Sequence, residues 1–423
     1  MEFKKVSVLG LGYVGLPTAA LLATSGVTVL GYDTNPEVRK KLRSGEAHIT
    51  EPGLRIVLRA ALESSRLQIV DELSNSDAFI IAVPTPVEEK HGDLSFVRSA
   101  TESIAKVVKK GNLVILESTV TPGTTKNLVG ATIERLTGLK AGTDFLLAYC
   151  PERILPGKIL KEMVENDRII GGINENSAKA AHDLYSYFVE GKLLLTDCTT
   201  AEVVKLAENS FRDANIAFAN ELSQICETVG VSVWEVIKLA NHHPRVKILN
   251  PGAGVGGHCI SVDPWMLIEV AKKAELMATA RKVNDEQPLY VAHQILGILK
   301  AHKIKNPVAA LFGVTYKADV DDVRNSPTKT VGLNLRENGV KVRFCDPHVS
   351  EFCGEKTKRV EDAVKGANIV VFLVAHSAWQ NLEPQKIANL VRTKLVYDST
   401  GAENAENWAG FEFYQLGSPK QKI

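Results

Sequence analysis

The sequence predicts an α/β fold with two Rossmann-like, doubly wound domains, joined by a long central helix and a helical region. Short β-branched runs alternate with amphipathic stretches in the first and last parts of the chain, whereas helical periodicity dominates the middle. Strand–helix alternation, with strands that are apolar throughout, is typical of parallel sheets covered on both faces. We therefore expect three domains, at residues 1–199, 200–303 and 304–423.

The first region contains six runs that we interpret as strands, with an amphipathic stretch at Ser95–Lys109 among the helices between them. These runs are Val6–Leu9, Thr28–Tyr32, Ala78–Val83, Leu113–Ser118, Phe145–Ala148 and Asp167–Gly171.

The middle region begins with a stretch from Ala201 to Val229 that contains neither Gly nor Pro, which predicts an unusually long central helix. Further helices are expected at Ser232–Ala240, Pro264–Lys273 and Gln287–His302. In the last region strands are expected at Val308–Phe312, Lys341–Cys345, Ile369–Val374 and Leu395–Asp398.

Composition argues against several classes of protein. The 50 basic residues balance the 49 acidic ones and aromatic residues make up 6%, so neither a basic stripe nor base-stacking platforms are indicated. The six cysteines are scattered without a C-x-x-C pair, which favours a reducing compartment over a disulfide scaffold or a zinc site. No signal peptide or bilayer-spanning run is evident. We expect a cytoplasmic protein without metal, nucleic-acid or membrane partners.

The segment Gly10-Leu-Gly12-Tyr-Val-Gly15 is a dinucleotide-binding fingerprint between the first strand and the first helix. Gly10 permits the tight turn, Gly12 lets the backbone approach the pyrophosphate, and Gly15 allows the helix to pack closely. Asp33, at the end of the second strand, suits a ribose 2′-hydroxyl and repels a 2′-phosphate. The segment therefore predicts NAD rather than NADP, against the alternative of a glycine-rich turn without a ligand.

A second segment, Val255–Pro264, places Cys259 between a glycine-rich loop and the start of a helix. The helix dipole can stabilise a thiolate there, and Asp263 could hydrogen-bond the thiol or a substrate. A buried, inert cysteine is the alternative. His258 and Cys259 are adjacent, which is poor geometry for binding one metal.

Two further segments carry candidate polar groups. Lys205 and Asn209 are four residues apart on the long helix and share a face, so they could hold an oxyanion, although an exposed lysine is the commoner case. Glu152 follows the fifth strand, where parallel sheets place functional groups, although a carboxylate paired with Arg153 is the alternative.

Two more loops follow strands. The segment Glu117–Gly123 contains Ser118 and Thr119 at the expected cofactor edge. The segment Gly313–Pro327 has basic residues suited to phosphate, although a charged surface loop is the alternative.

The motifs GLGYVG, KLAENSFR, GGHC-x-x-x-DP and YKADVDDVRNSP occur together over essentially the whole chain, which resembles the UDP-glucose/GDP-mannose dehydrogenase family. Three stretches, PERILPGK, SFRDANIAFANELS and NHHPRVKILNPGAGVGGHCISVDPW, are similar to its members that oxidise UDP-N-acetyl-D-mannosamine. Enzymes of this family that oxidise UDP-glucose typically have a second acid where this chain has Pro156, so that role is not carried over.

The resemblance implies a four-electron oxidation of a sugar C6 hydroxyl to a carboxylate with two NAD. It implies that Cys259 forms a thiohemiacetal and then a thioester, that Lys205 and Asn209 stabilise oxyanions, and that Glu152 activates water. Thr119 orients that water or the hydroxyl, and Lys205, Asp263 or a water is the base of the first oxidation.

The resemblance also implies binding roles and a partner. The cofactor contacts are Gly10, Gly12, Tyr13, Val14, Gly15, Asp33, Pro84, Thr85, Ser118, Thr119 and Arg324. The UDP-sugar contacts are Glu152, Arg153, Ile154, Leu155, Lys205, Asn209, Arg212, Arg245, Gly256 and Lys317, with Arg245 reaching the substrate of a neighbouring subunit. The long helix is then the core of a homodimer.

Three alternatives stay open at this point. The same chemistry could act on UDP-N-acetylglucosamine or UDP-glucose. A two-electron hydroxyacid dehydrogenase would share the layout but need no cysteine. The chain could also be a non-catalytic NAD-binding sensor.

Overall fold

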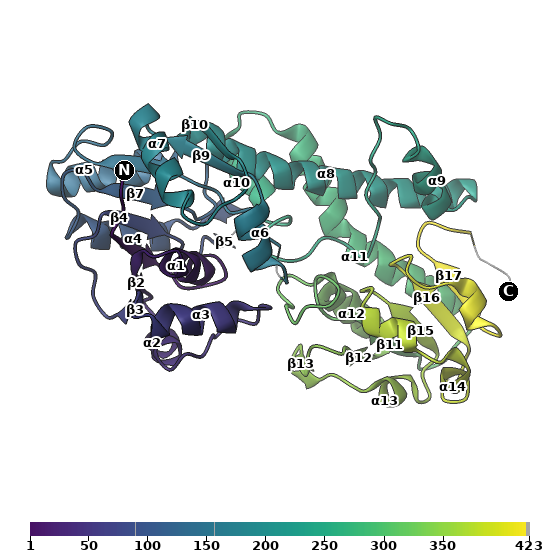
Figure 1. The fold of residues 1–423 in the computed structure, drawn as a ribbon. Coiled ribbons are helices and arrows are strands. Elements are labelled where there is room, and N and C mark those ends of the chain that lie inside the picture. The colour runs from purple at the N-terminus through teal and green to yellow at the C-terminus, as the bar shows by residue number, and fades with distance from the viewer. Residues whose placement is uncertain (89, 156, 420–423) are drawn as a thin grey trace. The chain divides into compact units, whose positions relative to one another are not determined.

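The computed structural model describes residues 1–88, 90–155 and 157–419, which form two compact units. The first unit comprises Met1–Glu208 and Trp265–Lys272, and the second comprises Asn209–Pro264 and Lys273–Ile423. Both are α/β, and the helix α8 (Cys198–Val229) begins in the first unit and ends in the second (Figure 1). The predicted fold class is confirmed, and the three-domain division stays a prediction.

The first unit contains an eight-stranded sheet in the order β10-β9-β8-β7-β4-β1-β2-β3. Its strands are β1 (Lys5–Leu9), β2 (Thr28–Tyr32), β3 (Leu67–Val70), β4 (Ala78–Ile81), β7 (Leu113–Leu116), β8 (Leu146–Tyr149), β9 (Arg168–Gly172) and β10 (Leu193–Asp197). All six predicted strands are present, within two residues at each end. The two edge strands, β3 and β10, were not predicted, because their partly exposed faces weaken the apolar pattern.

One expectation for this sheet is wrong: it is not parallel throughout. The pair β8–β9 is antiparallel, with Ala148 opposite Gly172, and β10 runs parallel to β9. The other neighbouring strands are parallel. A strand that is apolar throughout reveals burial but not direction, so the sequence could not predict this reversal.

Helices cover both faces of this sheet. Along β4, Ala78 and Ile80 join one core cluster while Phe79 and Ile81 join the other, as the period-two alternation of a strand requires. The helices are α1 (Gly15–Thr24), α2 (Pro36–Arg43), α3 (Leu54–Glu63), α4 (Ser95–Ala105), α5 (Ala131–Thr137), α6 (Ile159–Glu165) and α7 (Glu175–Tyr185), with a π-helical turn at Thr125–Gly130 and a small hairpin of β5 (Val87–Glu88) and β6 (His91–Gly92).

The second unit is built on a five-stranded parallel sheet in the order β12-β11-β15-β16-β17. Its strands are β11 (Val308–Phe312), β12 (Lys341–Cys345), β15 (Ile369–Phe372), β16 (Leu395–Asp398) and β17 (Glu412–Gln415), with a hairpin of β13 (Glu351–Phe352) and β14 (Glu355–Lys356). The helices are α9 (Val233–Ala240), α11 (Glu275–Ala301), α12 (Pro327–Glu337), α13 (Val360–Val364) and α14 (Pro384–Ala388), and α10 (Asp263–Val270) crosses the boundary between the units.

The helix α11 is much longer than predicted. The prediction began it at Gln287, but the helix starts at Glu275 and runs through Pro288. A buried polar cluster joins this added part to α8, since Arg281 pairs with Asp213 at 2.5 Å and Asn284 donates to the same carboxylate at 2.8 Å.

Among the described residues, no helix is long and apolar enough to cross a membrane.

Candidate active site

The glycine-rich loop follows β1, the strand at which the order of the first sheet reverses. Gly10 has φ +88°, and a Cβ there would lie 2.5 Å from the carbonyl oxygen of Ala82. A Cβ on Gly15 would lie 1.9 Å from the carbonyl oxygen of Gly10, whereas one on Gly12 would meet nothing within 4 Å. Two glycines are therefore needed for packing and the third leaves open space, which fits the division of roles in a dinucleotide site.

Asp33 is held beside this loop. Its carboxylate accepts hydrogen bonds from the backbone N–H groups of Leu11 at 3.0 Å and Asn35 at 2.8 Å. The nearby guanidinium of Arg39 donates to Asp71 at 2.9 Å and to the Asp33 carbonyl oxygen. The guanidinium of Arg39 is thus already bonded to an acid, which favours a ribose hydroxyl over a 2′-phosphate at Asp33.

The loops after β4 and β7 lie against this edge of the sheet. The amide of Ala82 donates to the carbonyl oxygen of Leu9 at 2.8 Å, so the segment leading to Pro84 and Thr85 starts next to the glycine loop. The Ser118 hydroxyl donates to the Val83 carbonyl oxygen at 2.7 Å. The structure therefore brings most of the predicted cofactor residues to one edge, with Tyr13 exposed and Val14 packed against the core.

Glu152 lies at the same edge and pairs with a residue that the sequence reading missed. Its carboxylate forms an ion pair with Arg168, at the start of β9. Arg153 pairs instead with Glu208 at 2.6 Å, so the alternative of a Glu152–Arg153 side-chain pair is wrong. Because both Glu152 and Arg168 are largely buried, losing one partner of the pair should cost about 3–5 kcal/mol.

A second buried carboxylate shares the guanidinium of Arg168. Glu117 lies 3.5 Å from Arg168 Nη1 and accepts hydrogen bonds from the hydroxyls of Tyr185 at 2.6 Å and Thr18 at 3.4 Å. Burial raises the pKa of Glu117 from 4.5 to about 7, against the opposing effect of Arg168. Burial also raises the pKa of the neighbouring Cys150 thiol to about 12, so that thiol stays protonated.

The reversal of β9 explains why Arg168 is present here. Because β9 runs against β8, its first residue lies beyond the carboxyl end of β8, where Glu152 follows. In a parallel sheet Arg168 would lie at the opposite edge. The only sequence signal was a charged residue before an apolar run, which is too common to be informative.

The segment after Glu152 is anchored by its backbone. The Leu155 amide donates to Glu162 at 2.8 Å, and Ile154 packs partly against the core. The Gly157 amide donates to the buried Glu51 carboxylate at 2.8 Å. Pro156 lies outside the described residues.

Of the remaining predicted catalytic residues, Thr119 and Lys205 are both half-buried in the first unit. Asn209 lies one turn beyond Lys205 on α8, is buried, and belongs to the second unit. Its amide donates to Asp263 at 2.6 Å. The Asp263 amide donates in turn to the carbonyl oxygen of Cys259 at 2.8 Å, so Asn209, Asp263 and the exposed Cys259 are directly linked.

The loop before Cys259 packs against the basic loop of the last sheet. The Gly257 backbone amide donates to the Arg324 carbonyl oxygen at 3.0 Å, and the side-chain amide of Asn325 donates to the Gly257 carbonyl oxygen at 3.0 Å. A Cβ on Gly256 would lie 2.7 Å from the Asn325 carbonyl oxygen, so only glycine fits. The segments Val255–Pro264 and Gly313–Pro327, which were predicted as separate loops, are thus packed together.

The other predicted basic residues lie at the surface or in loops. Arg324 pairs with Asp322. Arg212 is exposed on α8, and Arg245 is exposed and contacts His243. Lys317 is half-buried, and its carbonyl oxygen accepts a bond from the Thr315 hydroxyl at 2.7 Å.

Models of three domains of one family match the chain. The UDP-glucose/GDP-mannose dehydrogenase family, NAD binding domain, matches residues 4–189. The central domain of the same family matches residues 199–286, and its UDP binding domain matches residues 310–404.

Named relatives agree with this match along the whole chain. The chain is 44% identical over 427 residues to a UDP-N-acetyl-D-mannosamine dehydrogenase of Methanococcus maripaludis, covering 99% of this chain and 98% of the relative. It is 43% identical over 422 residues to an NDP-N-acetyl-D-galactosaminuronic acid dehydrogenase of Ralstonia solanacearum, covering 97% and 98%. The solved UDP-D-ManNAc dehydrogenase from Pyrococcus horikoshii is similar with a TM-score of 0.92 and 43% identity, covering 98% of this chain and 99% of that one.

The raised pKa of Glu117 predicts a pH-dependent stability. Because the folded protein holds this proton more tightly than the unfolded chain, Glu117 contributes stability below pH 4.5 that is lost as the pH rises through about 7. The side chain of Glu117→Gln cannot ionise. As the pH rises from 4.5 to about 7, the free energy of unfolding of the wild type should therefore fall relative to that of Glu117→Gln. Urea unfolding at several pH values measures the difference.

The exposed Glu63→Gln is the matched control, and its difference from the wild type should not change with pH in this way. A pH-independent difference between Glu117→Gln and the wild type would contradict the prediction.

Proposed function

We propose that this chain, which belongs to the UDP-glucose/GDP-mannose dehydrogenase family, oxidises the C6 hydroxyl of UDP-N-acetyl-D-mannosamine to a carboxylate through a covalent adduct on Cys259. The observation that carries the proposal is the buried Asn209–Asp263 pair bonded to the turn that presents Cys259. A two-electron dehydrogenase needs no nucleophile, and a non-catalytic sensor needs no such polar pair behind one.

The cofactor is NAD, which accepts a hydride in each of the two oxidations. The chain supplies the glycine loop for its pyrophosphate and Asp33 for its ribose. Pro84, Thr85, Ser118 and Thr119 line the same sheet edge, and we assign Arg324 to the cofactor diphosphate.

In the covalent steps, the Cys259 thiolate attacks the aldehyde carbon and forms a thiohemiacetal, which the second oxidation converts to a thioester. Lys205 donates to the oxyanions with its ammonium, and Asn209 does so with its side-chain amide. Holding the aldehyde on Cys259 keeps it from escaping between the two oxidations.

Hydrolysis of the thioester requires a base, and Glu152 takes this role. Its carboxylate is held in place by the ion pair with Arg168. Thr119 orients the water. The base of the first oxidation is Lys205, Asp263 or a bound water.

The remaining assignments concern binding. Arg153, Ile154, Leu155, Arg212, Gly256 and Lys317 contact the UDP-sugar, and Arg245 reaches the substrate of a neighbouring subunit. The relative from Methanococcus maripaludis is named for UDP-N-acetyl-D-mannosamine, which supports this sugar over UDP-N-acetylglucosamine or UDP-glucose.

A substrate panel tests the proposal. Purified protein is incubated with NAD and each of several UDP-sugars, and NADH formed is compared with sugar consumed. Two NADH per UDP-N-acetyl-D-mannosamine are expected, with the acid as the product. A ratio near one, or faster turnover of UDP-glucose, would overturn the assignment.

The role of Glu152 predicts a trapped intermediate. Glu152→Gln should lower kcat by about 10²–10⁴-fold, because the thioester forms but is not hydrolysed. Intact-protein mass spectrometry should then show the chain carrying one sugar-nucleotide acyl group. Cys259→Ser is the matched control and should carry none; an unmodified Glu152→Gln chain with slow turnover argues against this role.

We also propose a homodimer through α8. Phe211, Phe218 and Ile225 recur every seven residues on this helix and are 69%, 54% and 52% exposed, and Val229 is 65% exposed. Burying a phenylalanine against a second copy would contribute about 1.5–3 kcal/mol. A heptad stripe of this kind is typical of helix pairing.

Phe218→Asp should therefore convert the dimer to a monomer, because a carboxylate is costly to bury in an apolar interface. Light scattering after gel filtration gives the mass. Leu276→Asp makes the same change at an exposed position of α11 and should leave the dimer intact. A Phe218→Asp protein that stays dimeric excludes this interface.

A further inference from the structure

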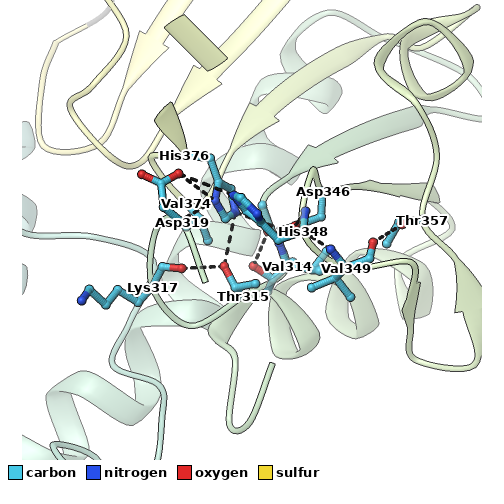
Figure 2. A network of polar contacts seen from close by, with 12 residues as sticks. Val314, Thr315, Lys317, Asp319, Asp346, His348, Val349, Thr357, Val374 and His376 are labelled. Atoms are coloured by element: carbon cyan, nitrogen blue, oxygen red, sulfur yellow. Dashed lines mark hydrogen bonds and ion pairs between the residues drawn. The ribbon is translucent and has the colours of Figure 1, made fainter. Parts of the chain in front are cut away.

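Three metal-ligating side chains meet at the carboxyl edge of the second sheet (Figure 2). Asp319 is in the loop after β11, His348 follows β12, and His376 follows β15. One ligand atom from each lies within 4.8 Å of the other two. These strands flank the point where the strand order reverses, which is where open α/β sheets bind ligands.

The distances are close to those of a bound ion. Asp319 Oδ1 lies 3.6 Å from His348 Nε2 and 3.7 Å from His376 Nδ1, and the two imidazole rings are 5.0 Å apart between centroids. A tetrahedral ion with ligand bonds of about 2.0–2.1 Å needs ligand atoms roughly 3.3 Å apart. Shifts of a few tenths of an ångström therefore suffice for these two pairs.

His376 is fixed from behind by a buried carboxylate. Its Nε2 lies 3.1 Å from Asp346 Oδ2, and neither side chain is exposed. When Nε2–H donates to this carboxylate, Nδ1 is the ring nitrogen with the lone pair, and it faces Asp319. A histidine ligand whose second ring nitrogen donates to a carboxylate is the usual arrangement around bound metals.

Asp346 also holds the neighbouring backbone. It accepts from the amides of Val314 at 2.7 Å and His348 at 2.8 Å, so one carboxylate fixes the starts of two ligand loops and one ligand ring. One ligand, His376, is therefore anchored by a buried carboxylate, while Asp319 and His348 are exposed.

We propose that Asp319, His348 and His376 bind a divalent first-row transition ion, with Zn²⁺ as the expected occupant. Two imidazoles and one carboxylate suit Zn²⁺ or Co²⁺, whereas Mg²⁺ and Ca²⁺ prefer oxygen ligands alone. Three protein ligands leave a further coordination position open for water. This site is separate from the groups assigned to the oxidation.

The ion must compete with hydrogen bonds that the cluster already makes. The Asp319 amide donates to His376 Nδ1 at 3.0 Å, and Ser377 donates to Asp319 Oδ1 through its amide at 2.9 Å and its hydroxyl at 3.0 Å. Binding of the ion therefore replaces the hydrogen bond from the Asp319 amide to His376 Nδ1 with a metal–nitrogen bond. This competition predicts reversible binding rather than a permanently held ion.

An ion here would tie together three loops, one of which carries Lys317. Thr315 lies 3.2 Å from His376 Nε2 and bonds the Lys317 carbonyl oxygen, while the Lys317 side chain points away from the cluster (Figure 2). The ion would thus rigidify the backbone of the loop that carries Lys317 without contacting the ammonium group of Lys317.

The test is a Co²⁺ titration of the chelator-stripped full chain, followed by visible absorption and calorimetry. One Co²⁺ should bind per chain and give visible d–d bands without the ultraviolet band of a thiolate ligand. Zn²⁺ should displace it and raise the melting temperature. His348→Phe keeps a ring and Asp319→Asn keeps an oxygen acceptor, and each should weaken Co²⁺ binding at least about tenfold.

His182→Asn is the matched control, since it removes another partly exposed histidine, one that lies 3.4 Å from Asp183. It should bind Co²⁺ like the wild type, and circular dichroism verifies that all variants are folded. Absence of the visible bands in the wild type, a thiolate band, or unchanged binding in His348→Phe would each overturn the proposal. All these readouts are independent of dehydrogenase activity.

Discussion

The ion pair between Arg168 and Glu152 is the interaction on which the chemistry of the first unit depends. One buried guanidinium faces two carboxylates, so Glu117 and Glu152 cannot both be neutralised by it. The conflict falls on Glu117, which is fully buried and whose pKa burial raises to about 7. Glu152, whose side chain is 9% exposed, forms the closer ion pair with the Arg168 guanidinium. The same cation therefore opposes the effect of burial on Glu117 while it pairs with Glu152.

That arrangement follows from a single reversed strand. Because β9 runs against β8, a residue at its start arrives beside residues that follow β7 and β8. Glu152 was predictable, since it follows a strand directly and the carboxyl edge of a parallel sheet is the expected place for function. Arg168 was not, because its importance comes from strand direction, which an apolar run does not encode. The turn of the glycine loop was predictable for the opposite reason, because the positions of Gly10 and Gly15 are set by local geometry; its cofactor contacts stay a prediction.

In the second unit, too, the strands were predictable but the contacts between distant loops were not. The strands of the five-stranded sheet were predicted within two residues, apart from the edge strand β17, yet the three ligands of the proposed metal site lie in separate loops far apart in sequence. The spacing of Asp319, His348 and His376 resembles no metal-binding motif, and no metal was predicted from the sequence. The packing of Gly256 and Gly257 against Arg324 and Asn325 escaped prediction likewise, because contact between distant loops is fixed by the sheet and not by either segment.

Charge provides a physical reason to expect a cation at the second edge. In the first unit a guanidinium compensates two carboxylates. In the second, Asp319 and Asp346 face two imidazoles, and one ring nitrogen of His376 accepts from an amide while the other lies against Asp346. The buried side chain of Asp346 accepts from three backbone amides and lies against His376 Nε2. A divalent ion would supply to this edge the positive charge that Arg168 supplies to the other, and it would do so through side chains that already point at one another.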